Sequence, residues 1–113
     1  REILQYATDR HIEILPEIDV PGHCHAAIIA MKQRRKRLEA NPIQGSPADQ
    51  YLLSEPDDPS KYLSYQYFTD NSVNPCLNST YAFLEKVLNE TVKLHEGIAP
   101  LKTFIFGGDQ VAE

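Results

Sequence analysis

The chain has 113 residues, 24% of them charged, and a formal net charge of −5 at pH 7. The acidic balance argues against nucleic-acid binding, and no segment approaches the ~20 apolar residues of a membrane span. The sequence opens inside an apparent helix without an initiator Met and offers only two confident strands, both nearly all apolar. Because such strands need neighbours on both sides and helices on both faces, we interpret residues 1–113 as a fragment of one larger α/β barrel domain. A small self-contained α/β domain is the alternative.

The first elements follow from the spacing of apolar residues. Residues 1–10 predict the end of a helix, with Ile3, Leu4 and Ala7 as its apolar stripe. Residues 12–19, Ile-Glu-Ile-Leu-Pro-Glu-Ile-Asp, predict a strand, since a proline near the end of a strand is tolerated. The Pro-Gly pair within residues 20–23 then predicts a loop.

A second helix is predicted from about residue 26 to residue 39. Its later turns contain the basic run Lys-Gln-Arg-Arg-Lys-Arg at 32–37, a pattern that can also mark a nucleic-acid or targeting patch. Cations in the last turns of a helix suit the negative end of its dipole. We therefore interpret the run as a solvated helix face.

Residues 41–74 form a long connection that is rich in turn formers. A connection of this length is unusual in a compact domain unless it is functional, and in a barrel an insertion after a strand lies on the active-site face. Its aromatic residues could stack on sugar rings, or they could fasten the loop to the barrel. These residues are Tyr51, Tyr62, Tyr65, Tyr67 and Phe68.

The last third of the chain predicts a helix and a second strand. Residues 81–94 present an apolar face, a Ser or Thr within 78–80 suits the N-cap, and Gly97 marks the helix end. The apolar run 103–106 then predicts a buried parallel strand. The two glycines at 107–108 permit another group to approach the end of that strand closely.

Two cysteines and two sequons bear on the cellular setting. Cys24 and Cys76 are compatible with a free thiol pair or with one disulfide, and sequence does not show the geometry that a disulfide requires. The tripeptides that begin at Asn78 and Asn89 match the N-glycosylation sequon.

Two separated blocks resemble one known family. Residues 14–23, Ile-Leu-Pro-Glu-Ile-Asp-Val-Pro-Gly-His, look like the strand-three block of family 20 glycoside hydrolases, the β-N-acetylhexosaminidases. Residues 107–111, Gly-Gly-Asp-Gln-Val, resemble the strand-four block Gly-Gly-Asp-Glu-Val. Residues 74–76 and the helix after them look like the chitobiase-type branch, so the resemblance spans nearly the whole chain. It implies a partial (βα)8 TIM barrel of about two βα units, strands three and four of the family barrel.

The resemblance implies substrate-assisted retaining hydrolysis, in which the 2-acetamido oxygen of the sugar attacks the anomeric carbon. It matches Asp109 to the carboxylate that orients the acetamide, Gln110 to the position of the acid, and His23 to the hydrogen-bonded support of that acid. Asp19 and Glu17, at the end of the first strand, are expected to support this network. The alternatives are purely structural: Asp109 could cap a helix, and His23 could be a hydrogen-bonded loop histidine without a role in the chemistry.

The family needs no metal and no cofactor. His23, Cys24 and His25 could also be read as metal ligands, but adjacent residues seldom converge on one ion. We therefore expect no metal site at this turn.

Two departures from the family pattern bear on activity. Ile105 stands where the family commonly has a His, and Gln110 stands where the acid Glu belongs. An amide cannot donate a catalytic proton, and general acid catalysis contributes typically ~10²–10⁴-fold. A non-catalytic homologue, an error in the sequence and an engineered Glu-to-Gln change would each account for Gln110.

The resemblance implies a hexosaminidase that acts on glycans ending in N-acetylglucosamine or N-acetylgalactosamine, such as chitin oligosaccharides. Together with the sequons it favours a secreted, extracellular setting, with a lysosomal one as the alternative. The competing hypothesis is a catalytically impaired homologue that binds chitin or other glycans, for example in an extracellular matrix. A structural barrel fragment without a ligand is the third.

Overall fold

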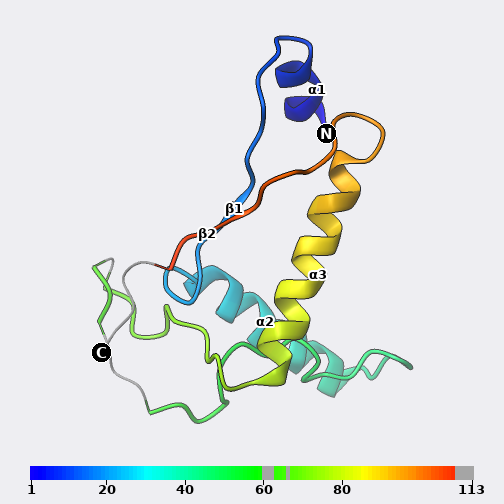
Figure 1. Ribbon diagram of the computed structural model, residues 1–113. Helices are drawn as coiled ribbons and strands as arrows, with labels where there is room; N and C mark the ends of the chain where they lie inside the picture. Colours follow the sequence, from blue (N-terminus) through cyan, green and yellow to red (C-terminus); the bar gives the residue numbers. More distant parts are fainter. Residues whose placement is uncertain (60–62, 66, 109–113) are drawn as a thin grey trace.

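The computed structural model describes residues 1–59, 63–65 and 67–108. Two parallel strands are joined by a crossover that contains two long helices, and a short helix precedes them (Figure 1). In chain order the elements are α1 (Glu2–Thr8), β1 (Glu17–Ile18), α2 (His25–Ala40), α3 (Asn78–His95) and β2 (Ile105–Phe106). The predicted parallel α/β arrangement is confirmed at this level, and it is consistent with part of a barrel.

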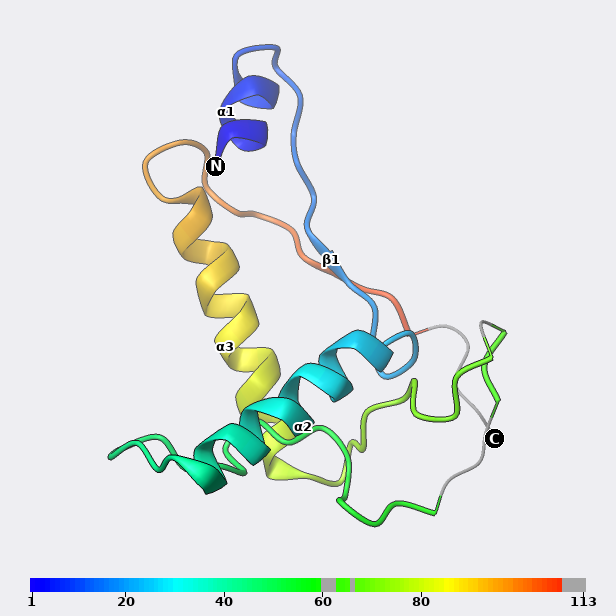
Figure 2. The ribbon, with the colours of Figure 1, turned by 180° about the vertical axis from the view of Figure 1, so that it is seen from behind.

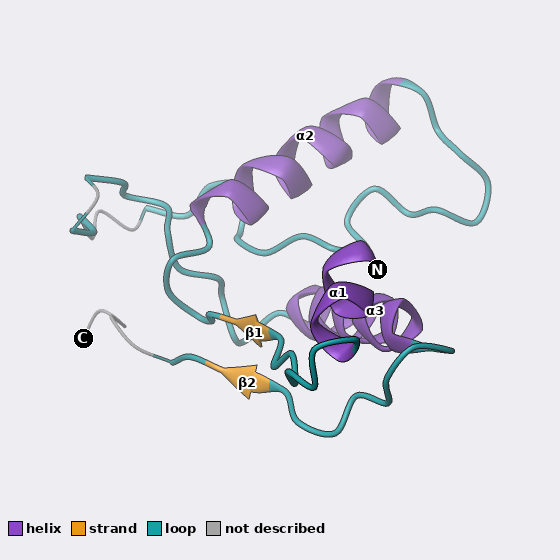
Figure 3. Ribbon diagram, turned by 90° about the horizontal axis from the view of Figure 1, so that it is seen from above, coloured by secondary structure: helices purple, strands orange, loops and turns teal. Residues whose placement is uncertain are grey.

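Both strands are shorter and more exposed than predicted. Glu17 pairs with Ile105 and Ile18 with Phe106, and β1 and β2 lie side by side (Figure 3). The prediction of a strand over 12–19 and of a buried strand over 103–106 is therefore wrong in extent and burial, since Phe106 is 52% exposed. The reason is the small sheet: in the described part of the chain each strand has one neighbour, so one edge of each strand has no partner strand.

The helices agree better with the prediction, with corrections at their ends. α2 starts and ends within one residue of the expected bounds. In α1, Leu4 and Ala7 are buried as expected, but Ile3 is exposed, because it lies about 100° around the helix from Leu4. α3 ends at His95, two residues before Gly97, which has a φ of 74°.

The predicted Ser or Thr N-cap of α3 is wrong. The N-cap is Leu77, and its side chain makes no capping hydrogen bond. The Ser79 hydroxyl instead donates to the carbonyl of Leu52 at 2.6 Å, and the Thr80 hydroxyl donates to the carbonyl of Asn74 at 2.7 Å. These hydroxyls therefore fasten the long connection to the start of α3.

Two arginines of α2 hold the long connection to the helix, so the solvated-face interpretation of the basic run is wrong for them. Arg34 donates to the carbonyls of Pro47 and Ala48, both at 3.1 Å, and its guanidinium lies 4.9 Å from the ring centre of Tyr51. Arg35 lies 2.9 Å from a carboxylate oxygen of Asp49. The exposed members of the run are Gln33, Lys36 and Arg37.

The core is small and lies between α2, the long connection and the start of α3. Its buried members are Cys24, Ile28, Leu53 and Val73, of which Ile28 and Leu53 are fully buried. The radius of gyration is 16.4 Å, against about 13 Å for a compact domain of about 100 residues. The open shape is plain from behind, where α1 and α2 lie at opposite ends of the molecule (Figure 2).

Candidate functional site

The carboxyl ends of β1 and β2 bring the two sequence blocks together. Asp19 follows β1, Gly107 and Gly108 follow β2, and the Gly108 N–H donates to Asp19 Oδ1 at 3.2 Å. A Cβ on Gly107 would lie 2.7 Å from Asp19 Cγ and closer still to Oδ1. Real Cβ atoms essentially never make such contacts. The predicted close approach of another group to these glycines is confirmed, and that group is the Asp19 carboxylate.

His23 lies on the other side of the same carboxylate. Its Nε2 is 3.8 Å from Asp19 Oδ2, and its imidazole is about one quarter exposed, at 25%. The backbone of His23 has a φ of 55°, in the left-handed region that non-glycine residues seldom adopt. One carboxylate thus contacts both an amide that follows β2 and the turn that carries the histidine.

Cys24 ties this turn to the backbone of Asp19. Its Sγ donates to the Asp19 carbonyl oxygen at 3.3 Å. Burial, and secondly the charge of Asp19, raise the pKa of the Cys24 thiol above its ordinary value. The thiol therefore keeps its proton at neutral pH and remains a hydrogen-bond donor, which helps to fix the Asp19 backbone.

Of the remaining predicted site residues, Glu17 lies within the described part of the chain and the other two lie outside it. Glu17 lies two residues before Asp19, on the same face of the extended chain, and its side chain is exposed. Asp109 and Gln110 directly follow Gly108 in the sequence but lie outside the described residues. Their roles stay predictions.

The described residues contain no group of three or more His, Cys, Asp or Glu side chains that could hold a metal ion. His23 and His25 have separate partners, Asp19 and Asp70. In the same ranges, no helix is long and apolar enough to span a membrane.

The structure also describes both cysteines and both sequon asparagines. Cys24 is buried and Cys76 is exposed, and both are free thiols, so the disulfide that the sequence left open is not formed. Asn78 and Asn89 are both exposed on α3, at its first residue and in its second half. Glycosylation at these two positions stays a prediction.

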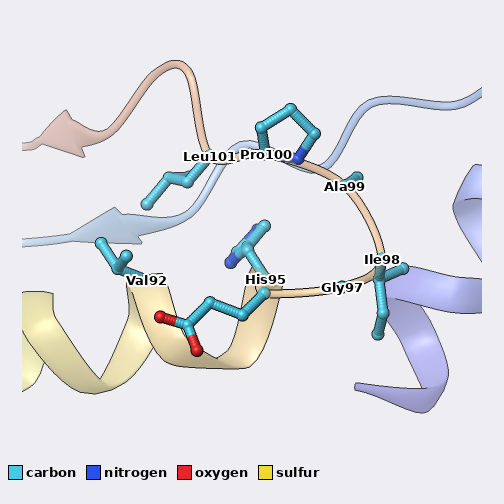
Figure 4. A pocket seen from close by; sticks show the side chains of 8 residues that line it. Val92, His95, Gly97, Ile98, Ala99, Pro100 and Leu101 are labelled. Carbon is cyan, nitrogen blue, oxygen red and sulfur yellow. The ribbon is translucent and has the colours of Figure 1, made fainter.

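One cavity lies before the amino end of β2, at the opposite end of the strand pair from Asp19. It has a volume of about 480 Å³ and is lined by Val92, His95, Ile98, Pro100 and Leu101, among others (Figure 4). The His95 Nδ1 lies 2.9 Å from the carbonyl of Thr91, while its buried Nε2 has no hydrogen-bond partner in the described part of the chain. Catalytic groups of barrels lie at the carboxyl ends, so this cavity is separate from the candidate site.

Sequence reasoning missed a contact between α2 and the long connection. His25 binds Asp70, 45 residues further along the chain, and its ring stacks on Phe68. No local spacing marks this pair, because it depends on the path of an irregular loop. Of the aromatic residues singled out in that loop, Tyr65 and Tyr67 are exposed, and Tyr62 lies outside the described residues.

Comparison with protein families matches residues 1–113 to glycosyl hydrolase family 20, catalytic domain. Beta-hexosaminidase B of Pseudoalteromonas piscicida is 47% identical over 98% of this chain and 14% of that protein. Beta-hexosaminidase of Vibrio vulnificus is 42% identical over 99% of this chain and 13% of that protein, and N,N'-diacetylchitobiase of Vibrio harveyi is 41% identical over 96% and 12%. The chain thus spans 12–14% of the length of these curated relatives. The resemblance is confirmed: the chain belongs to glycosyl hydrolase family 20, as a segment of its catalytic domain.

Proposed function

We propose that this chain is the part of a β-N-acetylhexosaminidase that supports the acid and the acetamide-orienting carboxylate. The reaction is removal of terminal non-reducing N-acetylhexosamine with retention, by substrate assistance. The observation that carries the proposal is the contact of one Asp19 carboxylate with Gly108, at 3.2 Å, and with His23, at 3.8 Å. This contact lies at the carboxyl ends of parallel strands, where barrel enzymes keep their chemistry. The named relatives, two beta-hexosaminidases and a chitobiase, support the substrate class.

Each residue has a stated role in this proposal. Asp109 accepts the acetamide N–H and so polarises the oxygen that attacks the anomeric carbon. The residue at position 110 stands beside the leaving oxygen, and His23 supports it. Asp19 braces His23 through its Oδ2 and holds the Gly108 amide, one residue before Asp109, through its Oδ1. Glu17 supports the same strand end.

A second candidate function is a glycan-binding homologue with impaired catalysis. The observation that favours it is Gln110 itself, whose side-chain amide can hydrogen-bond to a sugar but cannot protonate a leaving group. The exposed sequon asparagines are consistent with a secreted setting for either candidate, and a lysosomal one is the alternative.

The test compares Gln110 with Gln110→Glu in the protein that carries residues 1–113. With an N-acetylglucosaminide that has a poor leaving group, the Glu variant should be ~10²–10⁴-fold faster, because general acid catalysis contributes that much. Gln44→Glu, a matched change in the long connection, should leave the rate unchanged, since Gln44 is exposed and lies in the turn after α2. Calorimetry with N-acetylglucosamine separates the two candidates: binding without turnover in either form of residue 110 supports the glycan-binding function. Equal turnover by both forms contradicts the proposed role of position 110.

A further inference from the structure

A compact cluster joins the first turn of α2 to the end of the long connection. The His25 Nδ1 lies 2.6 Å from Asp70 Oδ1, and its ring stacks on Phe68 with 3.9 Å between ring centres and 11° between planes. Lys32, two turns further along α2, brings its Nζ to 4.0 Å from Asp70 Oδ2. The side chains of His25 and Asp70 are 33% and 30% exposed, so the pair is partly shielded from water. The short distance and parallel stack give a specific, oriented contact.

The segment anchored by this cluster also binds the turn that carries His23, on both sides of that residue. The Val73 N–H donates to the carbonyl of Pro21 at 2.9 Å, and the Cys24 N–H donates to the carbonyl of Asn71 at 2.7 Å. Between these two bonds, His23 has its left-handed φ of 55°. A strained backbone conformation of this kind persists only where the surroundings over-determine it. The conformation of His23 therefore depends on where residues 68–73 lie.

We propose that His25 and Asp70 are positioning residues: their contact holds residues 68–73 against the 20–24 turn and so fixes His23 beside Asp19. The role of His23 in hydrolysis rests on the proposed function above. The docking of residues 68–73 does not, because it follows from hydrogen bonds between described residues alone.

The contact depends on the charge of Asp70. A hydrogen bond that a carboxylate accepts is about twice as strong as one between neutral groups. The charged side chain that also meets Asp70 within the described residues is Lys32 from α2, with its Nζ at 4.0 Å from Asp70 Oδ2. Lys32 still holds Asp70 when His25 is replaced, so loss of His25 alone weakens the docking without abolishing it.

Hydrogen exchange at two amides measures the docking directly. In the protein that carries residues 1–113, Asp70→Asn keeps the shape but removes the charge, and should lower the protection factors of the Val73 and Cys24 amides about fivefold, because a hydrogen bond to a carboxylate becomes a weaker neutral one. His25→Asn should lower these protection factors less, because its amide still donates to Asp70 and Lys32 still holds the same carboxylate. Glu90→Gln removes a matched carboxylate from the exposed pair with Lys86 on α3 and should leave these amides unchanged.

A kinetic measurement tests whether the docking positions His23. In the Gln110→Glu protein, Asp70→Asn should lower kcat about tenfold and change KM little, because support of a general acid acts mainly in the transition state. Equal protection in the unchanged protein and in Asp70→Asn overturns the docking role. If Asp70→Asn loses amide protection but keeps its kcat, the proposal that the docking positions His23 is overturned. A Gln110→Glu protein without any hydrolysis counts against the proposed function, and the exchange measurement then still decides the docking.

Discussion

The carboxylate of Asp19 occupies the space that a side chain on Gly107 would need. A Cβ there would lie 2.7 Å from Asp19 Cγ and 3.3 Å from its Cα. The same carboxylate accepts the N–H of Gly108, across 89 residues of sequence. The end of the parallel strand pair is thus filled by the Asp19 side chain, and position 107 requires a glycine because of that contact rather than because of its own backbone conformation.

Gly107→Ala should destabilise the protein that carries residues 1–113 by about 1–3 kcal/mol, the usual cost of overpacking. Urea unfolding measures the loss. The test of the cause is a double-mutant cycle, since Asp19→Ala removes Oδ1 and Cγ and should relieve most of the cost of a new Cβ. Additive losses in the double variant would show that the carboxylate is not what excludes the methyl group.

The sequence was sufficient to predict this meeting of strand ends. Nearly all-apolar runs before Asp19 and Gly107 indicate parallel strands, and parallel strands bring their carboxyl ends to one edge. Strand length and burial could not be predicted, because both depend on neighbouring strands. Phe106 is apolar and expected inside, yet it is 52% exposed beside a single partner strand.

Local sequence patterns also could not predict the side-chain contacts that the long connection makes with the helices. Ser79 and Thr80 have the residue types of an N-cap, but their hydroxyls bind loop carbonyls, so tertiary contacts override the local preference. Arg34 has the spacing of a solvated face and instead binds the carbonyls of residues 47 and 48. The contact of His25 with Asp70 has no periodic signal at all.

The two cysteines should differ in reactivity. Cys76 is exposed and should be alkylated quickly by iodoacetamide, whereas Cys24 should react slowly, because burial and Asp19 raise the pKa of its thiol above its ordinary value and the thiolate is the nucleophile. Mass spectrometry of the two peptides over time measures both rates. Faster modification of Cys24 than of Cys76 in the folded protein would contradict the buried hydrogen bond to Asp19.

The same thiol should make stability fall at alkaline pH. A pKa raised in the folded state means that the folded protein holds the proton more tightly than the unfolded chain. Its contribution to the free energy of unfolding is complete below the unfolded pKa and is lost as pH rises through the folded value. Cys24→Ala should remove this part of the alkaline loss, whereas Cys76→Ala should not. If the free energy of unfolding falls equally at alkaline pH in Cys24→Ala and Cys76→Ala, the assignment of this loss to the Cys24 thiol is contradicted.

Asp109→Asn should weaken the binding of 2-acetamido sugars more than that of sugars without the acetamide. The proposed contact of the carboxylate with the amide N–H is a charged hydrogen bond, worth about 1.5–3 kcal/mol. Calorimetry with N-acetylglucosamine and with glucose, on the protein that carries residues 1–113, compares the two. Equal losses for both sugars would reject the assignment.

Residues 1–113 expressed alone should not fold cooperatively. The strands β1 and β2 contain two residues each, and large apolar side chains on α1, α3 and β2 are exposed, including Ile3, Tyr81 and Phe106. The buried cluster of Cys24, Ile28, Leu53 and Val73 is small for a chain whose radius of gyration is 16.4 Å. Burial of apolar surface is the main favourable term that offsets the conformational entropy of folding, and here much of that surface stays in water. Urea unfolding followed by circular dichroism should give a broad, shallow transition without a folded baseline. A sharp two-state transition from a chain that elutes as a monomer would show that these residues are a complete folding unit.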